Sequence, residues 1–254
     1  MKKLCETRNT KWKTLVATSV AVTLAAASAQ ANNLFGIDVS SYQGAPNWTS
    51  VHNCGAQYAF AKATEGNYYQ DSRFNSNMAN GKAAGMQMGA YDFARPDLLC
   101  PSTEANYFWG FAGGKIIADG HSLYPMVDFE VFNGHACTGS YTEWFNDWEA
   151  DVKAKTSHFL HPVIYASAGS GMCDLSTSCT LSAWVAHYNG ENLYTGNPWD
   201  GCCSCCNYVS PCTKNGWTYW QVSSTGSICG ISGNVDFDAY PLSLSLLISY
   251  QGVK

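Results

Sequence analysis

The chain has 254 residues, a formal net charge of −5, 14% aromatic residues and 12 cysteines. This length allows one large domain or two small ones. The excess of acidic over basic side chains disfavours binding to nucleic acid, whose phosphates attract Lys and Arg. Beyond the first 31 residues, no run is long and apolar enough to cross a membrane.

The N-terminal segment has the three parts of a secretory signal. Residues 1–13 carry five basic side chains, residues 14–29 are mostly apolar, and residues 29–31 form an A-x-A cleavage site. This pattern predicts a signal peptide over 1–31 and a mature chain over 32–254. A transmembrane anchor is the alternative, but the run is shorter than the ~20 residues that a span needs. We therefore expect an exported protein with no membrane contact after cleavage.

Removal of this segment makes the chain more acidic and leaves most of its cysteines. It takes 5 of the 14 Lys and Arg and 1 of the 19 Asp and Glu, so 9 basic and 18 acidic residues remain, a net charge of −9. Eleven cysteines remain, and in an oxidising compartment they predict disulfides with one thiol left over. The loop near 201–212 holds adjacent cysteine pairs, which lack the C-x₂-C spacing of zinc sites. We therefore expect no metal there, and sequence alone does not give the pairing.

Strand-like and helix-like segments alternate along the mature chain. Apolar runs predict strands over 34–39, 58–63, 86–93, 124–131, 162–166, 182–187 and 217–222. Helical spacing predicts helices over 73–84, 102–117 and 140–156, with Ser102 as a candidate N-cap. Residues 189–216 are predicted to be a long loop, and the tail over 241–250 is apolar without a clear period. The alternation favours an α/β unit with a parallel sheet, which can close into a barrel.

Two carboxylates stand inside one apolar run. Asp128 and Glu130 lie two residues apart within 124–131, so on a strand they project from the same face with Cβ atoms about 6.5–7 Å apart. Two acids this close cannot easily both ionise, so one pKa should rise and leave an acid beside a base. This is the arrangement that cleaves a glycosidic bond. A purely structural carboxylate is the alternative for Glu130.

Other acids also fall at or near the ends of predicted strands: Asp38, Glu65, Asp92 and Asp236. In parallel α/β folds the chemistry gathers at the carboxyl ends of strands. The aromatic residues can form platforms for sugars, although most of them should simply fill the core. The pattern therefore predicts a carboxylate active site in one groove.

Seven motifs in order resemble those of glycoside hydrolase family 25, the Chalaropsis-type lysozymes. They are FGIDVSSYQ at 35–43, AKATEG at 61–66, GAYDFARP at 89–96, VDFE at 127–130, IYAS at 164–167, WVAHY at 184–188, and WQVSS followed by GNVD between 220 and 236. The resemblance implies a single-domain, flattened and irregular TIM-like β/α barrel of about five βα units plus three further strands. It also implies hydrolysis of the β-1,4 bond between N-acetylmuramic acid and N-acetylglucosamine in peptidoglycan, without a metal or cofactor.

The resemblance also implies roles for residues. The general acid falls on Glu130, its partner on Asp128, and two further active-site acids on Asp38 and Asp236. For Asp38 a turn-capping role is an alternative, and Asp238 is a second candidate for the position of Asp236. Residues at motif positions that line or approach the groove are expected to bind substrate: Lys62, Glu65, Tyr91, Tyr165, Trp184, Tyr188 and Gln221.

The partner carboxylate Asp128 has two open roles. It could attack the anomeric carbon, or it could support attack by the 2-acetamido group of the sugar, which the family substrate carries. The spacing along a strand does not decide between them. We favour the substrate-assisted route.

Some features depart from the family pattern. Asp92 stands where the family often has His, and we expect this extra acid near the groove to influence neighbouring pKa values. A serine hydrolase built on His187 is disfavoured because no G-x-S-x-G motif is present. The remaining alternatives are a wall-binding lectin of the same fold and a glycosidase with chitinase-like specificity. We expect a monomer whose partner is the glycan strand of peptidoglycan.

Overall fold

The computed structural model describes residues 32–158, 160–175, 182–201 and 217–254. The segment Ala31–Lys254 forms one compact unit. Its strands are β1 (Leu34–Val39), β2 (Tyr58–Glu65), β3 (Tyr69–Gln70), β4 (Gln87–Phe93), β5 (Met126–Asp128), β6 (Val163–Ser167), β7 (Ala183–Ala186), β8 (Tyr219–Gly226) and β9 (Val235–Tyr240). Its α-helices are α1 (Trp48–Asn53), α2 (Phe74–Ala83), α3 (Pro101–Ala112), α4 (Tyr141–Ala154), α5 (Gly171–Asp174) and α6 (Leu244–Gln251).

Eight of the strands close into a barrel. The order around it is β1, β2, β4, β5, β6, β7, β8 and β9, and β9 pairs again with β1, while β3 is a short extension on β2. Neighbours from β1 to β8 run parallel, and β9 runs antiparallel to both of its neighbours. The first five large strands are each followed by a helix. Among the described residues no helix lies between β7, β8 and β9, and α6 follows β9. The predicted barrel of five βα units plus three strands is confirmed.

The boundaries of several elements differ from the sequence prediction. The strand predicted over 124–131 is shorter and ends at Asp128. The helix predicted from Ser102 begins at Pro101, with Cys100 at the N-cap, because proline is well suited to the first helical position. Strand β9 was not predicted, since its two acids break the apolar run, and the untyped tail is helix α6. The described part of the predicted loop, 189–201, contains no helix or strand.

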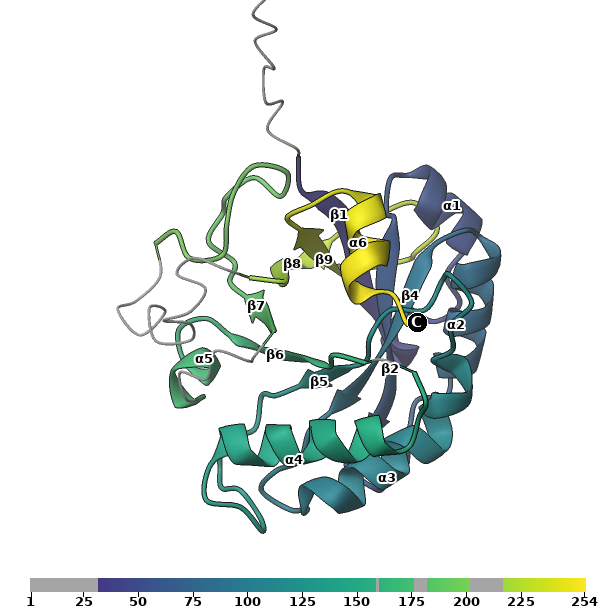
Figure 1. The fold of residues 1–254 in the computed structure, drawn as a ribbon. Helices are drawn as coiled ribbons and strands as arrows, with labels where there is room; N and C mark the ends of the chain where they lie inside the picture. The colour runs from purple at the N-terminus through teal and green to yellow at the C-terminus, as the bar shows by residue number, and fades with distance from the viewer. Residues whose placement is uncertain (1–31, 159, 176–181, 202–216) are drawn as a thin grey trace, which may run out of the picture. The chain divides into compact units, whose positions relative to one another are not determined.

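The outer core lies between the strands and the helices. Helices α2, α3 and α4 follow one another along one side of the barrel, outside β2, β4 and β5 (Figure 1). The amphipathic pattern of α4 buries Trp144 and Trp148 fully, and Trp148 packs on Phe108 of α3 with ring centroids 5.2 Å apart. Ser140 caps α4 by accepting a hydrogen bond from the backbone N–H of Glu143 at 3.1 Å.

A second core fills the barrel and is rich in aromatic residues. Tyr58, Phe60 and Tyr219 are fully buried in it, and the ring of Phe60 lies 5.1 Å from both Tyr219 and Trp184. Glycine makes room for these rings, because a Cβ on Gly36 would lie 2.2 Å from the ring of Tyr58. This packed interior supports the groove above it.

Two disulfides join distant parts of the unit, as the cysteine content predicted. Cys54 pairs with Cys229, and Cys100 pairs with Cys137. The cysteine-rich segment 202–212, where the metal alternative falls, lies outside the described residues. Within the described ranges, no cluster of three His, Cys, Asp or Glu side chains could hold a metal ion, and no helix is long and apolar enough to span a bilayer.

Candidate active site

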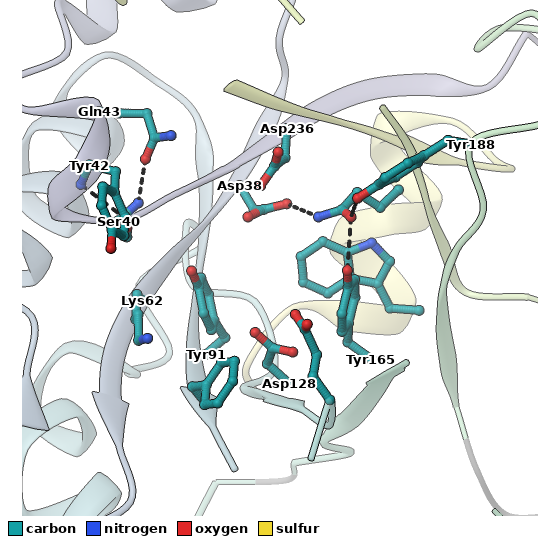
Figure 2. Close-up of a pocket in the computed structure, with 14 residues that line it drawn as sticks. Asp38, Ser40, Tyr42, Gln43, Lys62, Tyr91, Asp128, Tyr165, Tyr188 and Asp236 are labelled. Atoms are coloured by element: carbon teal, nitrogen blue, oxygen red, sulfur yellow. Dashed lines mark hydrogen bonds between the residues drawn. The ribbon is translucent and has the colours of Figure 1, made fainter. Parts of the chain in front are cut away.

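A groove opens at the end of the barrel where the parallel strands finish. Its volume is about 350 Å³. The residues that line it come from nearly every barrel strand and the turn after β1: Asp38, Ser40, Tyr42, Gln43, Lys62, Tyr91, Phe93, Asp128, Glu130, Tyr165, Trp184, Tyr188, Gln221 and Asp236. All four predicted catalytic acids are among them, and so are all but one of the predicted substrate-binding residues. Figure 2 shows how these side chains converge.

Asp128 and Glu130 meet in this groove by a route that differs from the prediction. Asp128 is the last residue of β5, and Glu130 lies beyond the strand in the following loop. Phe129 turns into the outer core between them, where it is fully buried against Trp144 and Phe132. Side chains alternate over residues 128–130, so Asp128 and Glu130 both reach the groove although β5 ends at Asp128, and Glu130 lies at the exposed mouth.

The carboxyl of Asp128 has a strongly perturbed pKa. Burial raises the pKa of Asp128 well above its usual range, and the charge of Glu130 and a hydrogen bond with it raise it further. Lys62 partly opposes this rise through its positive charge. Oδ1 of Asp128 is shielded from solvent and has no hydrogen-bond partner among the described residues. The raised pKa of Asp128 favours its protonated form beside Glu130, and one buried oxygen of Asp128 is left to accept a hydrogen bond.

A second carboxyl pair faces the first. Asp38 of β1 and Asp236 of β9 are register partners on neighbouring antiparallel strands. Burial and the charges of Asp238 and Asp236 raise the pKa of Asp38 well above its usual range. Burial and the charge of Glu130 raise the pKa of Asp236, while a hydrogen bond with Asp38 lowers it. Groups this close share protons, so they titrate together.

Gln221 of β8 connects Asp38 to the aromatic wall of the groove. Its Nε2 donates to Oδ2 of Asp38 at 2.8 Å. Its Oε1 accepts from the hydroxyls of Tyr165 at 2.8 Å and Tyr188 at 2.6 Å. These bonds are drawn in Figure 2. Each polar atom of the Gln221 amide that points to the groove is thus used to orient another groove residue.

Lys62 and Glu65 occupy different positions relative to the groove. Lys62 lines it, and its Nζ lies 4.6 Å from the centre of the Phe93 ring. Glu65 does not line it: its carboxylate accepts from Lys62 Nζ at 2.9 Å and from the Tyr68 hydroxyl at 2.8 Å. The prediction that Glu65 contacts substrate is therefore not supported by its position. Glu65 instead holds Lys62 in place.

The aromatic walls combine packing with orientation. Tyr91, Tyr165 and Trp184 are buried, so most of their surface belongs to the core even though each lines the groove. Trp184 Nε1 donates to Oδ1 of Asp238 at 3.0 Å. Asp238 is fully buried below the groove and does not line it, which supports Asp236 as the active-site residue of β9.

Asp92 does not line the groove, but its charge adds to the rise that burial causes in the pKa of Asp128, as the sequence analysis expected for its neighbours. Its side chain points from β4 into the outer core, where it accepts from Thr64 Oγ1 at 2.6 Å and from Trp148 Nε1 at 3.2 Å. It is fully buried beside Glu104 of α3. Neighbouring strand residues face opposite sides, so Tyr91 enters the groove and Asp92 cannot.

Sequence reasoning missed four lining residues: Ser40, Tyr42, Gln43 and Phe93. Ser40 and Gln43 form a capping box around the short 3₁₀ turn Ser41–Gln43. The S-x-x-Q spacing is a sequence signature of such a turn. That signal, placed directly after the strand carrying Asp38, could have identified this rim. His187, set aside as a hydrolase base, bonds instead through Nδ1 to the backbone oxygen of Pro198 at 2.6 Å.

Comparisons with known proteins agree with this geometry. The family model described as glycosyl hydrolases family 25 matches residues 37–231. Lysozyme M1 of Streptomyces globisporus is 34% identical over 87% of this chain and 72% of its own, and N,O-diacetylmuramidase of Chalaropsis is 30% identical over 79% and 95%. The crystal structure of the bacterial lysozyme from Streptomyces coelicolor is 35% identical, with a TM-score of 0.67, over 86% of this chain and 97% of that one. The chain belongs to glycoside hydrolase family 25.

Proposed function

We propose that this protein is a lysozyme that hydrolyses the β-1,4 bond between N-acetylmuramic acid and N-acetylglucosamine in bacterial peptidoglycan. Relatives that it matches over most of their length are named as a lysozyme and a muramidase. The groove is lined by four carboxyl groups, and two of them, Asp128 and Glu130, interact directly, as glycosidic cleavage requires.

The observation that carries this proposal is the hydrogen bonding of the Asp128 carboxyl. A hydrogen bond links its carboxyl to Glu130, and its buried Oδ1 has no partner among the described residues. A buried acceptor without a partner is costly, so it favours a ligand that donates a hydrogen bond there. The N–H of a sugar 2-acetamido group is such a donor. This supports a substrate-assisted reaction rather than direct attack by Asp128.

The reaction then proceeds in two steps. Glu130, at the open mouth of the groove, gives its proton to the glycosidic oxygen as the bond to the anomeric carbon breaks. The acetamide oxygen attacks that carbon and forms a cyclic oxazolinium ion, whose N–H bonds to the carboxylate of Asp128. A water molecule then opens the ring, giving its proton back to Glu130. The product keeps the configuration of the substrate.

The second carboxyl pair, Asp38 and Asp236, orients the reacting groups. Asp38 is held by Gln221 and Asp236, and together they face the position of the sugar opposite Asp128 (Figure 2). Lys62 adds a positive charge beside Asp128, which favours the ionised form of Asp128 during the first step. The aromatic side chains Tyr91, Tyr165, Trp184 and Tyr188 bound the sugar-sized space between the pairs.

The site acts outside the producing cell. The predicted signal peptide at 1–31 directs export, and the two disulfides suit an oxidising compartment. The mature chain 32–254 acts as a monomer on glycan strands.

The test is digestion of purified peptidoglycan by the mature chain, followed by a reducing-end assay and mass spectrometry. Fragments that end in reducing N-acetylmuramic acid are the expected result. Binding to the wall without release of fragments would instead identify a lectin. Release from chitin oligomers but not from peptidoglycan would identify a chitinase-like enzyme.

A further inference from the structure

We infer that Tyr42 forms an additional sugar-binding subsite at the edge of the groove, where its ring stacks on a pyranose ring of the glycan strand away from the cleaved bond. This inference rests on the proposed function, because it concerns how the same strand is held. It adds a residue that the family motifs did not mark as a ligand contact.

The exposure of Tyr42 is the first argument. The side chain lines the groove and is nevertheless 94% exposed, so it contributes almost nothing to the core. Figure 2 shows Tyr42 and Tyr188 on opposite sides of Asp38 and Asp236. Tyr188 is 54% exposed. A strand that crosses the carboxyl pairs therefore meets an exposed aromatic ring on each side.

The turn that carries Tyr42 is held rigidly. The backbone N–H of Tyr42 donates to Ser40 Oγ at 3.2 Å, and the backbone N–H of Ser40 donates to Gln43 Oε1 at 2.9 Å. Gln43 Nε2 also donates to the backbone oxygen of Asn234 at 3.3 Å, which ties the turn to the loop before β9. A ring on a fixed turn loses little backbone entropy when a ligand stacks on it.

A buried aspartate fixes the same turn from below. Asp71 is 2% exposed, and its Oδ2 accepts from the backbone N–H of Ser41 at 2.8 Å and from the Tyr69 hydroxyl at 3.3 Å. Its Oδ1 accepts from the backbone N–H of Arg73 at 2.8 Å. Both oxygens are used, so Asp71 is a positioning residue for the turn and not a ligand contact.

The chemistry around Tyr42 favours a sugar over a stem peptide. The residues beside it in the turn, Ser41 and Gln43, are uncharged. Among the ionisable groups that line the groove, the acids Asp38, Asp128, Glu130 and Asp236 outnumber the one base, Lys62. Peptide carboxylates would be repelled there, whereas the face of a neutral pyranose ring offers apolar C–H groups to an aromatic ring.

The experiment compares Tyr42→Ala, Tyr42→Phe and the control Tyr250→Ala. Tyr250 is also exposed, at 57%, but it lies on α6, which pairs with the opposite end of the barrel through Tyr124. On long glycan strands kcat/KM of Tyr42→Ala should fall about 10-fold, the scale of one aromatic stacking contact, mainly through KM. The loss should be much smaller on the shortest strand that is cleaved, and Tyr42→Phe should behave as wild type.

A binding measurement separates this inference from the proposed function. In a Glu130→Gln background, Tyr42→Ala should weaken binding to insoluble glycan strands from which the stem peptides have been removed. Equal losses on long and short strands, a loss in kcat alone, or an equal loss in Tyr250→Ala would overturn the subsite. Weakened binding only when stem peptides are present would show that Tyr42 contacts peptide. Failure of the wild type to cleave, with binding still dependent on Tyr42, would refute the enzyme but not the subsite.

Discussion

Asp38, near the end of β1, lies directly opposite Asp236, near the start of β9, in the antiparallel ladder that closes the barrel. This pairing explains how a strand that runs against all the others still contributes to the groove. The N-terminal end of β9 lies beside the C-terminal ends of the parallel strands. The reversed direction of β9 therefore brings Asp236 to the site as the partner of Asp38 without a further βα unit.

Glu130→Gln should leave the fold intact and abolish most activity. The side chain is exposed and lies outside any strand, so the substitution should change the free energy of unfolding by less than about 0.5 kcal/mol. Loss of a positioned proton donor should lower kcat by roughly 10²- to 10⁴-fold. Peptidoglycan turnover and thermal melting measure the two effects. Turnover close to wild type would remove Glu130 from its role.

The motifs in the sequence were enough to identify the groove and its acids, but the reason given for the central pair was incomplete. Asp128 and Glu130 were predicted to share a strand face, whereas β5 ends at Asp128 and a loop delivers Glu130. The position of Asp92 near a strand end did not show that it faces away from the groove, because an acid near a strand end can face either side. Only the register with neighbouring strands and helices decides which side, and single-strand patterns do not contain that register.

Residues held by distant partners were the hardest to predict. Glu65 belongs to the sequence motif of β2. Its role in holding Lys62 also depends on the hydroxyl of Tyr68, which donates to the same carboxylate from the turn after β2. Asp92 interacts with Glu104, a residue that no sequence motif marks. The two carboxyls come together only because α3 packs on the sheet at β2. Burial of such pairs follows from tertiary contacts rather than from local sequence.

The first product of cleavage should retain the anomeric configuration of the substrate. In the proposed route, the acetamide of the sugar attacks from one face and water replaces it on the same face, so two inversions cancel. Proton NMR during the first minutes of digestion, before the anomers equilibrate, measures this directly. An inverted product would exclude participation by the acetamide, and would leave Asp128 as a general base for water.

Gln221→Ala should lower both activity and stability. The substitution leaves the hydroxyl of the buried Tyr165 and the carboxyl of Asp38 without their shared partner. A lost partner for a buried polar group costs about 1–3 kcal/mol. Gln87→Ala is a matched control, because Gln87 is also buried but lies at the start of β4, away from the groove. We expect the control to lose stability and keep its kcat, as measured by melting and peptidoglycan turnover.

Stability should fall as the pH rises, in part because of the pair Asp92 and Glu104. Burial raises the pKa of Asp92 to about 7, and burial together with the charge of Asp92 raises the pKa of Glu104 to about 10. Both carboxyls ionise near pH 4 in the unfolded chain, so between pH 4 and about 10 the folded state binds more protons than the unfolded state. Raising the pH within that window therefore lowers the free energy of unfolding.

Glu104→Gln should reduce this dependence. The amide keeps an oxygen to accept from the backbone N–H of Arg95 and provides an N–H for Asp92, as the protonated acid does. We expect the melting temperature to drop less between pH 5 and pH 8 in this variant than in the wild type. Glu149→Gln, at an ion pair on the surface of α4, serves as the control and should follow the wild type. A larger drop in Glu104→Gln would show that the pair is ionised and stabilising at neutral pH.

The two disulfides should differ in what their removal does. The Cys54–Cys229 bond closes a loop with a sequence separation of 175 and the Cys100–Cys137 bond one of 37, so chain entropy predicts losses of about 5 and about 4 kcal/mol. Only the second bond ties the loop that follows Glu130 to the start of α3. Replacing Cys100 and Cys137 together by Ala should therefore also lower kcat, whereas replacing Cys54 and Cys229 should lower stability alone. Thermal melting, and turnover measured at temperatures below the melting transitions of both double variants, test this. Equal kcat in the two double variants would show that the Cys100–Cys137 bond does not position Glu130.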